Sequence, residues 1–294
     1  MGTPLKAKSL SAEKTETLLV MTLKRFIRHR LAVWGAITII IFVILALFAP
    51  WIAPYDYRQY NYSAFLQPPS LQHLLGTDNT GADLLSRIIY GARISLSAGF
   101  LAMLVAVLLG TFLGAAAGFY GGWVDNVAMR LVDIALSIPS LFLLLILVVI
   151  VPPSTIMVVL AIGVTRWMYP ARIVRSSFLS LRELEFVEAA RALGQVPGQI
   201  IFRHILPNAM GPLIVNATLL VGQAIITESV LSFLGVGIQP PVPSWGNMLS
   251  DAQSYIWNAP WLAIFPGLAI LMTVLAFNLV GDGLRDALDP RLKQ

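Results

Sequence analysis

The chain is dominated by long stretches that contain no charged residue. Residues 31–55, 94–124, 134–165 and 252–281 are each free of Asp, Glu, Lys and Arg, and each exceeds the roughly 20 residues that a helix needs to cross a bilayer. Hydrophobic residues make up 57% of the 294 residues and charged residues only 12%, a balance unlike that of soluble globular domains. The sequence therefore predicts an all-α integral membrane protein.

Two features raise the number of crossings above the four charge-free stretches: the longest of these stretches, and a further apolar run at residues 213–234. The 134–165 stretch has room for two crossings, and Pro152 and Pro153 predict a tight turn between them, because consecutive prolines cannot continue a helix. The fourth crossing is short and is expected to extend through Tyr169 and Pro170 or to lie inside the bundle. We predict six transmembrane helices, at residues 32–52, 95–119, 128–150, 155–168, 213–234 and 261–280.

An even number of crossings places both termini on one side, and basic residues indicate that this side is the cytoplasm. Only Arg58, Arg87 and Arg93 of the 20 Lys and Arg fall in predicted outer segments; the others, Arg166 included, are assigned to cytoplasmic segments. This bias accounts for the net charge of +5 without a nucleic-acid partner. The predicted parts are a cytoplasmic tail (1–31), a six-helix domain (32–281) containing outer segments 54–93 and 235–260 and a cytoplasmic loop 170–210, and a cytoplasmic end (282–294).

The cytoplasmic loop contains a segment suited to docking. Residues 181–193, LRELEFVEAARAL, predict a helix, and Gly194 is expected to end it because glycine readily adopts a positive φ. Pro197 fits the first turn of a second short helix, and Pro207 is expected to mark its exit. Glu188 is followed by two small residues, Ala189 and Ala190, so that a partner's groove could approach closely. The Glu-Ala-Ala triplet alone favours a plain amphipathic surface helix.

The complete arrangement is more specific. Glu188-Ala189-Ala190, three residues, Gly194, nine residues and then His204-Ile205-Leu206-Pro207 resembles the coupling motif of ABC importer membrane subunits, although that family favours Ile where this chain has His204. The blocks 75–87 (LGTDNTGADLLSR), 228–249 (ESVLSFLGVGIQPPVPSWGNML) and 275–291 (LAFNLVGDGLRDALDPR) resemble the second permease subunit of dipeptide, oligopeptide and nickel importers. Ala82 departs from the Arg common at its position.

The resemblance implies a type I importer permease (MetI-like) fold in a bacterial or archaeal inner membrane. It also implies a homologous permease as heterodimer partner, two ATP-binding subunits and an extracytoplasmic solute-binding protein. The residues expected to couple to the ATPases are Glu188, Ala189, Ala190, Gly194, His204, Leu206 and Pro207. Dipeptides or oligopeptides are the expected solutes, with nickel chelates, glutathione-like peptides and other small solutes left open.

The chain is not expected to be an enzyme or to hold a cofactor. It has no Gly-x-x-x-x-Gly-Lys-Ser/Thr phosphate loop, so ATP is expected to be hydrolysed by separate subunits. It has no cysteine, and residues 78–83 only loosely match a calcium loop, so no metal site is predicted. The alternative function is a self-sufficient channel or an ion-coupled secondary transporter, in which Glu228 would be the coupling carboxylate.

Polar residues in the fifth span are candidates for the transport pathway. Asn216, Gln223 and Glu228 can share one face of this span. A charge inside a span is costly unless it faces protein or water, so Glu228 is either a pathway carboxylate or a buried, hydrogen-bonded packing residue. Asn216 can equally bridge helices within the bundle.

Four further expectations concern packing and helix ends. The i, i+4, i+8 repeat Gly110, Gly114, Gly118 predicts close helix packing, within the subunit or against the partner permease. Arg130 and Asp133, three residues apart, are expected to pair on one helix face. A surface helix is expected over residues 81–90, with Asp78 or Thr80 as its N-cap. The last span is expected to end sharply at Gly281 and Gly283 and to be followed by an end-cap of charged residues: Asp282, Arg285, Asp286 and Asp289.

Overall fold

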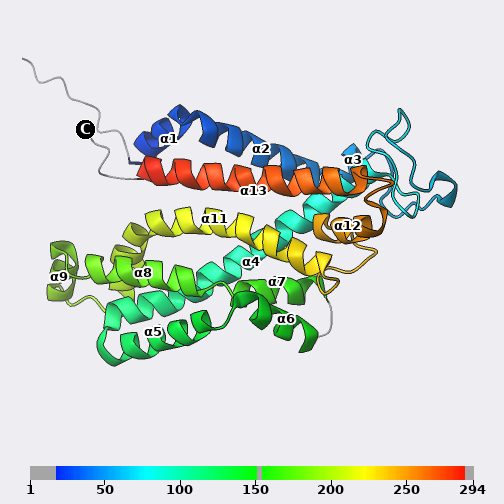
Figure 1. Ribbon diagram of the computed structural model, residues 1–294. Helices are drawn as coiled ribbons and strands as arrows, with labels where there is room; N and C mark the ends of the chain where they lie inside the picture. Colours follow the sequence, from blue (N-terminus) through cyan, green and yellow to red (C-terminus); the bar gives the residue numbers. More distant parts are fainter. Residues whose placement is uncertain (1–17, 151–153, 289–294) are drawn as a thin grey trace, which may run out of the picture.

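The computed structural model describes residues 18–150 and 154–288, and it is built from helices (Figure 1). The expected turn at Pro152 and Pro153, the first part of the tail and Asp289 lie outside these residues. The helices are α1 (Leu18–Arg28), α2 (Arg30–Leu47), α3 (Ala49–Ile52), η1 (Tyr62–Ala64), α4 (Leu84–Tyr120), α5 (Gly122–Ser137), α6 (Ser140–Ile150), α7 (Thr155–Val164), α8 (Met168–Leu181), α9 (Glu185–Ala192), α10 (Pro197–Gln199), η2 (Ile200–Ile205), α11 (Leu206–Phe233), α12 (Trp245–Ala252), η3 (Gln253–Tyr255) and α13 (Trp261–Leu288).

The helices account for six crossings when two bent pairs are each counted as one. Four helical runs are long and apolar enough to span a membrane: α2, α4, the run Pro197–Phe233 and α13. The other two crossings are the pair α5 and α6, bent by 88°, and the pair α7 and α8, bent by 43°. The start of α1 and the end of α13 lie at the same end of the bundle as α9, opposite α12 (Figure 1). The predicted all-helical membrane fold is therefore confirmed.

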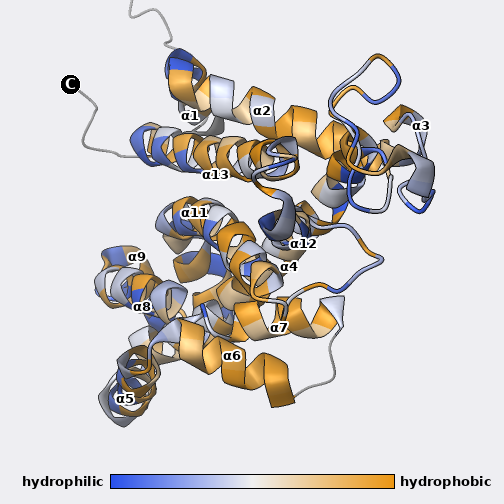
Figure 2. Cartoon of the chain, turned by 45° about the vertical axis from the view of Figure 1, so that its right-hand side comes forward, coloured by the Kyte–Doolittle hydropathy of each residue, from blue (hydrophilic) through white to orange (hydrophobic). Residues whose placement is uncertain are grey.

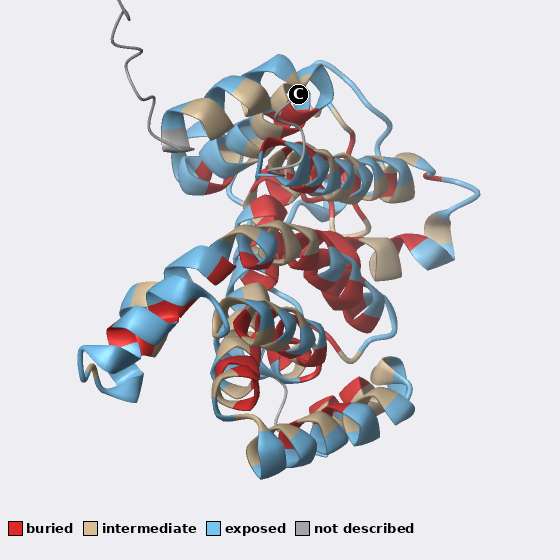
Figure 3. Ribbon diagram, turned by 90° about the vertical axis from the view of Figure 1, so that its left-hand side faces the viewer, coloured by how far each residue is buried: buried red, intermediate tan, exposed pale blue. Residues whose placement is uncertain are grey.

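Helix α4 runs through the middle of the bundle and packs against α8, α11, α7 and α2. The helices α1, α2 and α13 lie together on one side of it (Figure 1). Apolar residues cover the outward surfaces of α6 and α7 as well as their inner faces (Figure 2), as expected for helices surrounded by lipid or by other subunits. Buried residues concentrate along the middle of the bundle (Figure 3).

The glycine repeat of α4 packs within this subunit, against α8. A Cβ atom added at Gly110 would lie 2.5 Å from the Cβ of Pro170, and one at Gly118 would lie 2.5 Å from the Cβ of Phe178. At Gly114 the nearest atom would be the backbone oxygen of Ala171, at 2.4 Å. The first of the two packing alternatives is thus the one that the structure shows, and only glycine lets these two helices approach so closely.

Two predicted helix boundaries are wrong. The third span, expected at residues 128–150, is broken at Ile138 and Pro139 into α5 and α6, because proline has no N–H to continue the α5 hydrogen-bond ladder. The surface helix expected at residues 81–90 is instead the start of α4. Its N-cap is Asp83, whose carboxylate accepts from the N–H of Ser86 at 2.8 Å; Asp78 and Thr80 do not fill this position.

Two charged residues between the start of α5 and the end of α8, Asp133 and Arg166, are also placed differently from the predictions. Asp133 pairs with Arg172 of α8, with 2.6 Å between Oδ1 and Nη2, rather than with Arg130 on its own helix, because α5 packs beside α8. Arg166, which the charge count assigned to the cytoplasm, lies at the break between α7 and α8 of the bent pair.

The last span does not end at its two glycines. Helix α13 continues through Gly281 and Gly283 to Leu288, and both glycines are buried. A Cβ at Gly283 would lie 2.2 Å from that of Ala32, and one at Gly281 would lie 2.7 Å from Leu219. These glycines therefore serve close packing of α13 on its neighbours rather than a sharp exit.

Candidate functional site

Helix α9 is a short, separate helix at the end of the bundle where α1 begins and α13 ends, the end predicted to be cytoplasmic (Figure 1). It begins after Leu184 rather than at residue 181, and Glu188 in its first turn and Arg191 in its last both suit the helix dipole. Gly194 has a φ of +75°, as predicted. The N–H of Gly194 donates to the carbonyl of Arg191 at 2.9 Å and that of Gln195 to the carbonyl of Ala190 at 3.1 Å, which is the Schellman arrangement.

One side of α9 is fixed to the bundle. Val187 and Ala190 are 0% and 3% exposed and belong to a cluster with Phe178 of α8 and with Ile200 and Ile205 of η2. Ala190, which we expected to face a partner together with Ala189, thus packs inside the subunit. A bulkier side chain at Ala190 would disturb the packing of α9 against α8 and η2 rather than a docking surface.

The other side of α9 and the turn that follows it are exposed, and four of their residues form what we call the α9 surface: Glu188, Ala189, Leu193 and Val196. Glu188 and Ala189 are exposed, and the apolar side chains of Leu193 and Val196 are 80% and 57% exposed. The sequence analysis missed these two apolar residues. The sequence could have identified them, because Leu193 and Val196 are apolar residues on either side of Gly194 in an otherwise polar loop. Exposed apolar side chains of this kind are typical of a surface that binds a partner.

His204 holds the chain that leaves α9. Its Nε2 lies 2.8 Å from Oε1 of Gln195, and its carbonyl accepts from Nδ2 of Asn208 at 2.7 Å. The ring is half-buried, so it contributes to the shape of the loop rather than to the exposed α9 surface. Leu206 is half-buried against the same cluster as Ala190.

Pro207 is exposed in the first turn of α11, so the expected helix exit is wrong. The run from Pro197 through η2 into α11 is continuous. Pro207 directly follows the π-helical turn, in which the N–H of Leu206 bonds five residues back to Ile201, so it stands where the backbone hydrogen-bond pattern changes. The docking segment is therefore joined directly to the fifth span.

Replacing His204 by Ala is expected to loosen the 193–196 segment. The lost side-chain hydrogen bond contributes about 1 kcal/mol, so hydrogen exchange at Gln195 should accelerate about fivefold, as measured by mass spectrometry. Gln195→Ala should have the same effect, and the double variant should add little, because the two residues share one contact. The exposed neighbour provides the control: Arg203→Ala should leave exchange unchanged. Equal exchange in all variants would contradict this role of His204.

Glu228 is completely buried, with a relative exposure of 0%. Its Oε1 accepts from the hydroxyl of Ser232 at 2.7 Å and its Oε2 from that of Ser95 at 3.3 Å. The hydroxyl oxygen of Ser95 also accepts from the N–H of Trp245 at 3.2 Å. The carboxyl group thus connects α11 with α4 and α12, which favours the packing alternative over a position on the pathway.

Asn216 and Gln223 are more accessible than Glu228. Gln223 is exposed on the surface of α11. Asn216 borders a cavity of about 870 Å³ between α11 and α8 on one side and α1 and α13 on the other, where it lies with Ile173 and Asp282. Its Oδ1 is buried without a hydrogen-bond partner among the residues that the structure describes. Their place on a transport pathway remains a prediction.

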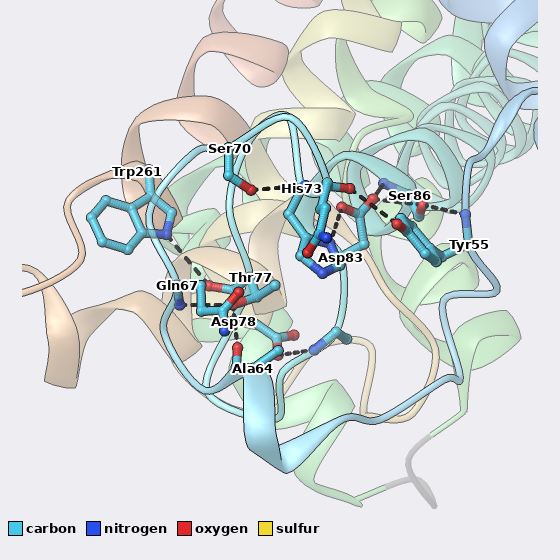
Figure 4. A network of polar contacts seen from close by, with 12 residues as sticks. Tyr55, Ala64, Gln67, Ser70, His73, Thr77, Asp78, Asp83, Ser86 and Trp261 are labelled. Carbon is cyan, nitrogen blue, oxygen red and sulfur yellow. Dashed lines mark hydrogen bonds and ion pairs between the residues drawn. The ribbon is translucent and has the colours of Figure 1, made fainter.

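The opposite end of the bundle carries a polar network in the segment before α4 (Figure 4). Oδ1 of Asp78 accepts from the N–H groups of Thr80 and Ala82 at 2.7 and 3.0 Å, and its Oδ2 pairs with Arg87. Nδ1 of His73 lies 3.0 Å from Oδ1 of Asp83. These carboxylates hold the turn and the start of α4 in place.

Asp251 of α12 lies beside this network, 3.8 Å from Nη2 of Arg87. Burial raises the pKa of its carboxyl group, and the Arg87 guanidinium opposes that shift. This contact joins α12 to the start of α4.

Comparison with known proteins gives consistent matches. Residues 110–294 match the family described as binding-protein-dependent transport system inner membrane component, and residues 17–69 match the N-terminal TM domain of oligopeptide transport permease C. The chain is 47% identical over 270 residues to the dipeptide transport system permease protein of Alkalihalophilus pseudofirmus, covering 92% of this chain and 89% of that protein. It is 44% identical over 271 residues to the glutathione transport system permease protein of Pectobacterium atrosepticum, covering 92% and 90%.

Solved structures resemble this chain in fold. An inward-facing structure of the MetNI methionine ABC transporter matches with a TM-score of 0.56 and 20% identity, covering 69% of this chain and 97% of that chain. An amino acid ABC transporter with histidines matches with a TM-score of 0.52 and 19% identity, covering 68% and 92%. The resemblance at this identity establishes the shared helical fold.

Proposed function

This chain belongs to the binding-protein-dependent inner membrane components of ABC importers, and from that premise we propose that it forms half of a peptide translocation pathway driven through α9. The observation that carries the proposal is the α9 surface. It is exposed, it combines a carboxylate with apolar side chains, and it lies at the cytoplasmic end of the bundle. The chain has no phosphate loop of its own, so a docking surface is the means by which ATP hydrolysis on another subunit can act on it.

The buried side of α9 gives the route by which movement would pass into the membrane. Val187 and Ala190 contact the cluster that includes Phe178 of α8 and Ile205 of η2, and η2 continues directly into α11. When the ATPases close, displacement of α9 would therefore carry α8 and α11 with it as packed helices. Such coupling changes access from outside to inside only if the two states have different contacts with the ATPases.

The proposed assembly contains a homologous permease, two ATP-binding subunits and an extracytoplasmic solute-binding protein. The apolar outward faces of the helices leave room for a second permease within the membrane. The outer segments before α4 and around α12 lie at the end where a binding protein would dock (Figure 1). Each ATPase would receive one docking helix, from this chain or from its partner.

Dipeptides and short oligopeptides are the proposed solutes, because similar proteins include a dipeptide permease and a glutathione permease. The test is uptake into proteoliposomes that contain the complete complex, with its binding protein outside and ATP inside. We expect ATP-dependent uptake of Ala-Ala at least about tenfold above vesicles with ADP, and weaker uptake of glutathione and of nickel–histidine. Preference for one of the latter two would overturn the substrate assignment. Uptake driven by an ion gradient without the ATPases would instead support a secondary transporter.

A further inference from the structure

Glu228 holds the chain before α12 and at the start of α12 through two serine hydroxyls. The hydroxyl of Ser95 donates to Oε2 of Glu228 at 3.3 Å and accepts from the N–H of Trp245 at 3.2 Å. The hydroxyl of Ser232 donates to Oε1 of the same carboxyl group at 2.7 Å and accepts from the N–H of Ile238 at 3.0 Å. Each carboxyl oxygen is thus joined by one hydroxyl to a backbone N–H on the far side.

The chain that Glu228 holds is a unit with its own internal contacts, which we call the α12 segment (residues 236–252). Nδ2 of Asn247 donates to the carbonyl of Ile238 at 3.3 Å and to that of Val242 at 2.7 Å. Asn247 and Ser244 also form a capping box at the start of α12. The loop and the helix are therefore fastened to each other, and a force on one acts on both.

The α12 segment lies directly against α4 and α11. Trp245 is 0% exposed, and its indole N–H donates to the carbonyl of Ile88 on α4 at 3.1 Å. A Cβ atom added at Gly246 would lie 2.6 Å from the Cα of Ser229 on α11. The backbones of α12 and α11 are thus in close contact beside the Glu228 carboxyl group, which adds a polar connection to this packing.

Helix α11 connects the α12 segment with the coupling segment at the other end of the bundle. It is α-helical for 28 residues, from Leu206 to Phe233, and a helix of this length measures about 42 Å. Its first residue directly follows η2, which shares a buried cluster with α9. Glu228 lies near its other end, at the side of the bundle opposite α9 (Figure 1). One helix therefore reaches both the proposed ATPase contact and the α12 segment.

We propose that Glu228 is a positioning residue that makes the α12 segment move with α11, so that docking of the solute-binding protein on this segment and closure of the ATPases on α9 favour each other. This inference rests on the proposed function. Gln239, Pro240 and Pro241 are the exposed part of the segment. Because the segment is fixed to α11, it presents a different surface to the binding protein in each state of α11. By linkage, each partner then changes the affinity of the other by the same factor.

The test compares how tightly the binding protein docks in two states of the ATPases. The complete complex is placed in nanodiscs, and the Kd of the binding protein mixed with Ala-Ala is measured without nucleotide and with a non-hydrolysable ATP analogue. We expect the two Kd values of the wild type to differ at least about fivefold, and those of Glu228→Leu less than about twofold. Leucine has a similar size but no hydrogen bonds, so the Kd of this variant without nucleotide should stay at the wild-type level, which a general loss of structure would not allow.

Three further variants identify the contacts that carry the effect. Glu228→Gln can keep both hydroxyl contacts, because an amide has an oxygen acceptor and N–H donors, and should retain the wild-type ratio of Kd values. Ser95→Ala and Ser232→Ala each remove one contact and should give intermediate ratios. The matched control is Ser97→Ala on the same helix as Ser95. The exposed hydroxyl of Ser97 donates to the carbonyl of Ile94 in its own helix at 3.0 Å, so its removal should leave the ratio unchanged.

Equal ratios in wild type and Glu228→Leu would overturn the inference, and so would a wild-type ratio close to one. If Glu228→Leu yields no complex, the serine variants decide, and wild-type ratios in both Ser95→Ala and Ser232→Ala would overturn it. A fall of the same size in Ser97→Ala would also contradict it, because the effect would then not depend on the Glu228 contacts. ATP-dependent uptake of Ala-Ala by the wild type, measured separately, shows whether the peptide function itself has failed.

Discussion

Glu188→Arg is expected to reduce ATP-driven uptake at least about tenfold while leaving the chain inserted in the membrane. The carboxylate is exposed in the first turn of α9, so the change removes a charge-assisted contact with the ATPase, worth about 1.5–3 kcal/mol. A cation at a helix N-terminus is also unfavourable by about 0.3–1 kcal/mol. Each 1.4 kcal/mol is about tenfold in affinity. Co-purification of the ATPases and uptake into proteoliposomes are the measurements.

The controls for this prediction come from the same loop. Glu183→Arg reverses an exposed charge between α8 and α9, outside the α9 surface, and should retain at least about half of wild-type uptake. Ala189→Trp places a large side chain on the exposed side and should uncouple as Glu188→Arg does. Ala190→Trp should differ from both, because it would disrupt the buried side of α9 and lower the yield of folded protein. Normal uptake and full ATPase content in Glu188→Arg would refute the proposed coupling.

Local sequence information was sufficient for the crossings and for the end of α9. Hydropathy over about 20 residues reports directly on membrane insertion, so six spans could be predicted without knowledge of their packing. Gly194 could be predicted because a positive φ after a helix is a backbone requirement that few residues meet. The orientation was predicted from the basic residues in each loop, which also requires no knowledge of helix packing, and it stays a prediction.

Features that depend on neighbouring helices could not be predicted in the same way. Nothing within α9 tells Ala189 from Ala190; their different exposure comes from contact with η2 and α8. Arg166 was counted with the cytoplasmic charges that follow it, although it lies at the break between α7 and α8 of one bent pair. The sequence could not decide whether Glu228 lines the pathway or packs inside the bundle. The residues that decide it are distant in the sequence: Ser95, which donates to Glu228, and Trp245, whose N–H donates to Ser95. Tertiary contacts decide these positions.

Gly114→Val is expected to destabilise the fold by about 3 kcal/mol, at the upper end of the usual cost of overpacking. The added Cβ would lie 2.4 Å from the carbonyl oxygen of Ala171 and 3.0 Å from the Cβ of Val174. Backbone cannot move aside as a flexible side chain can, so α4 and α8 would have to separate. α8 connects the coupling segment to the bundle core, so uptake should fall together with stability. Thermal unfolding of the purified complex should shift downward by about 6–12 °C.

The matched control is Gly267→Val in α13, where an added Cβ meets no atom within 4 Å. It makes the same chemical change in another membrane helix and replaces a glycine that itself weakens a helix, so the unfolding temperature should stay within about 2 °C of wild type or rise. The difference between the two variants isolates the contact of α4 with α8 from the effect of valine in a helix. Equal unfolding temperatures for Gly114→Val and Gly267→Val would mean that α4 and α8 are not held at the close distance that the three glycines permit.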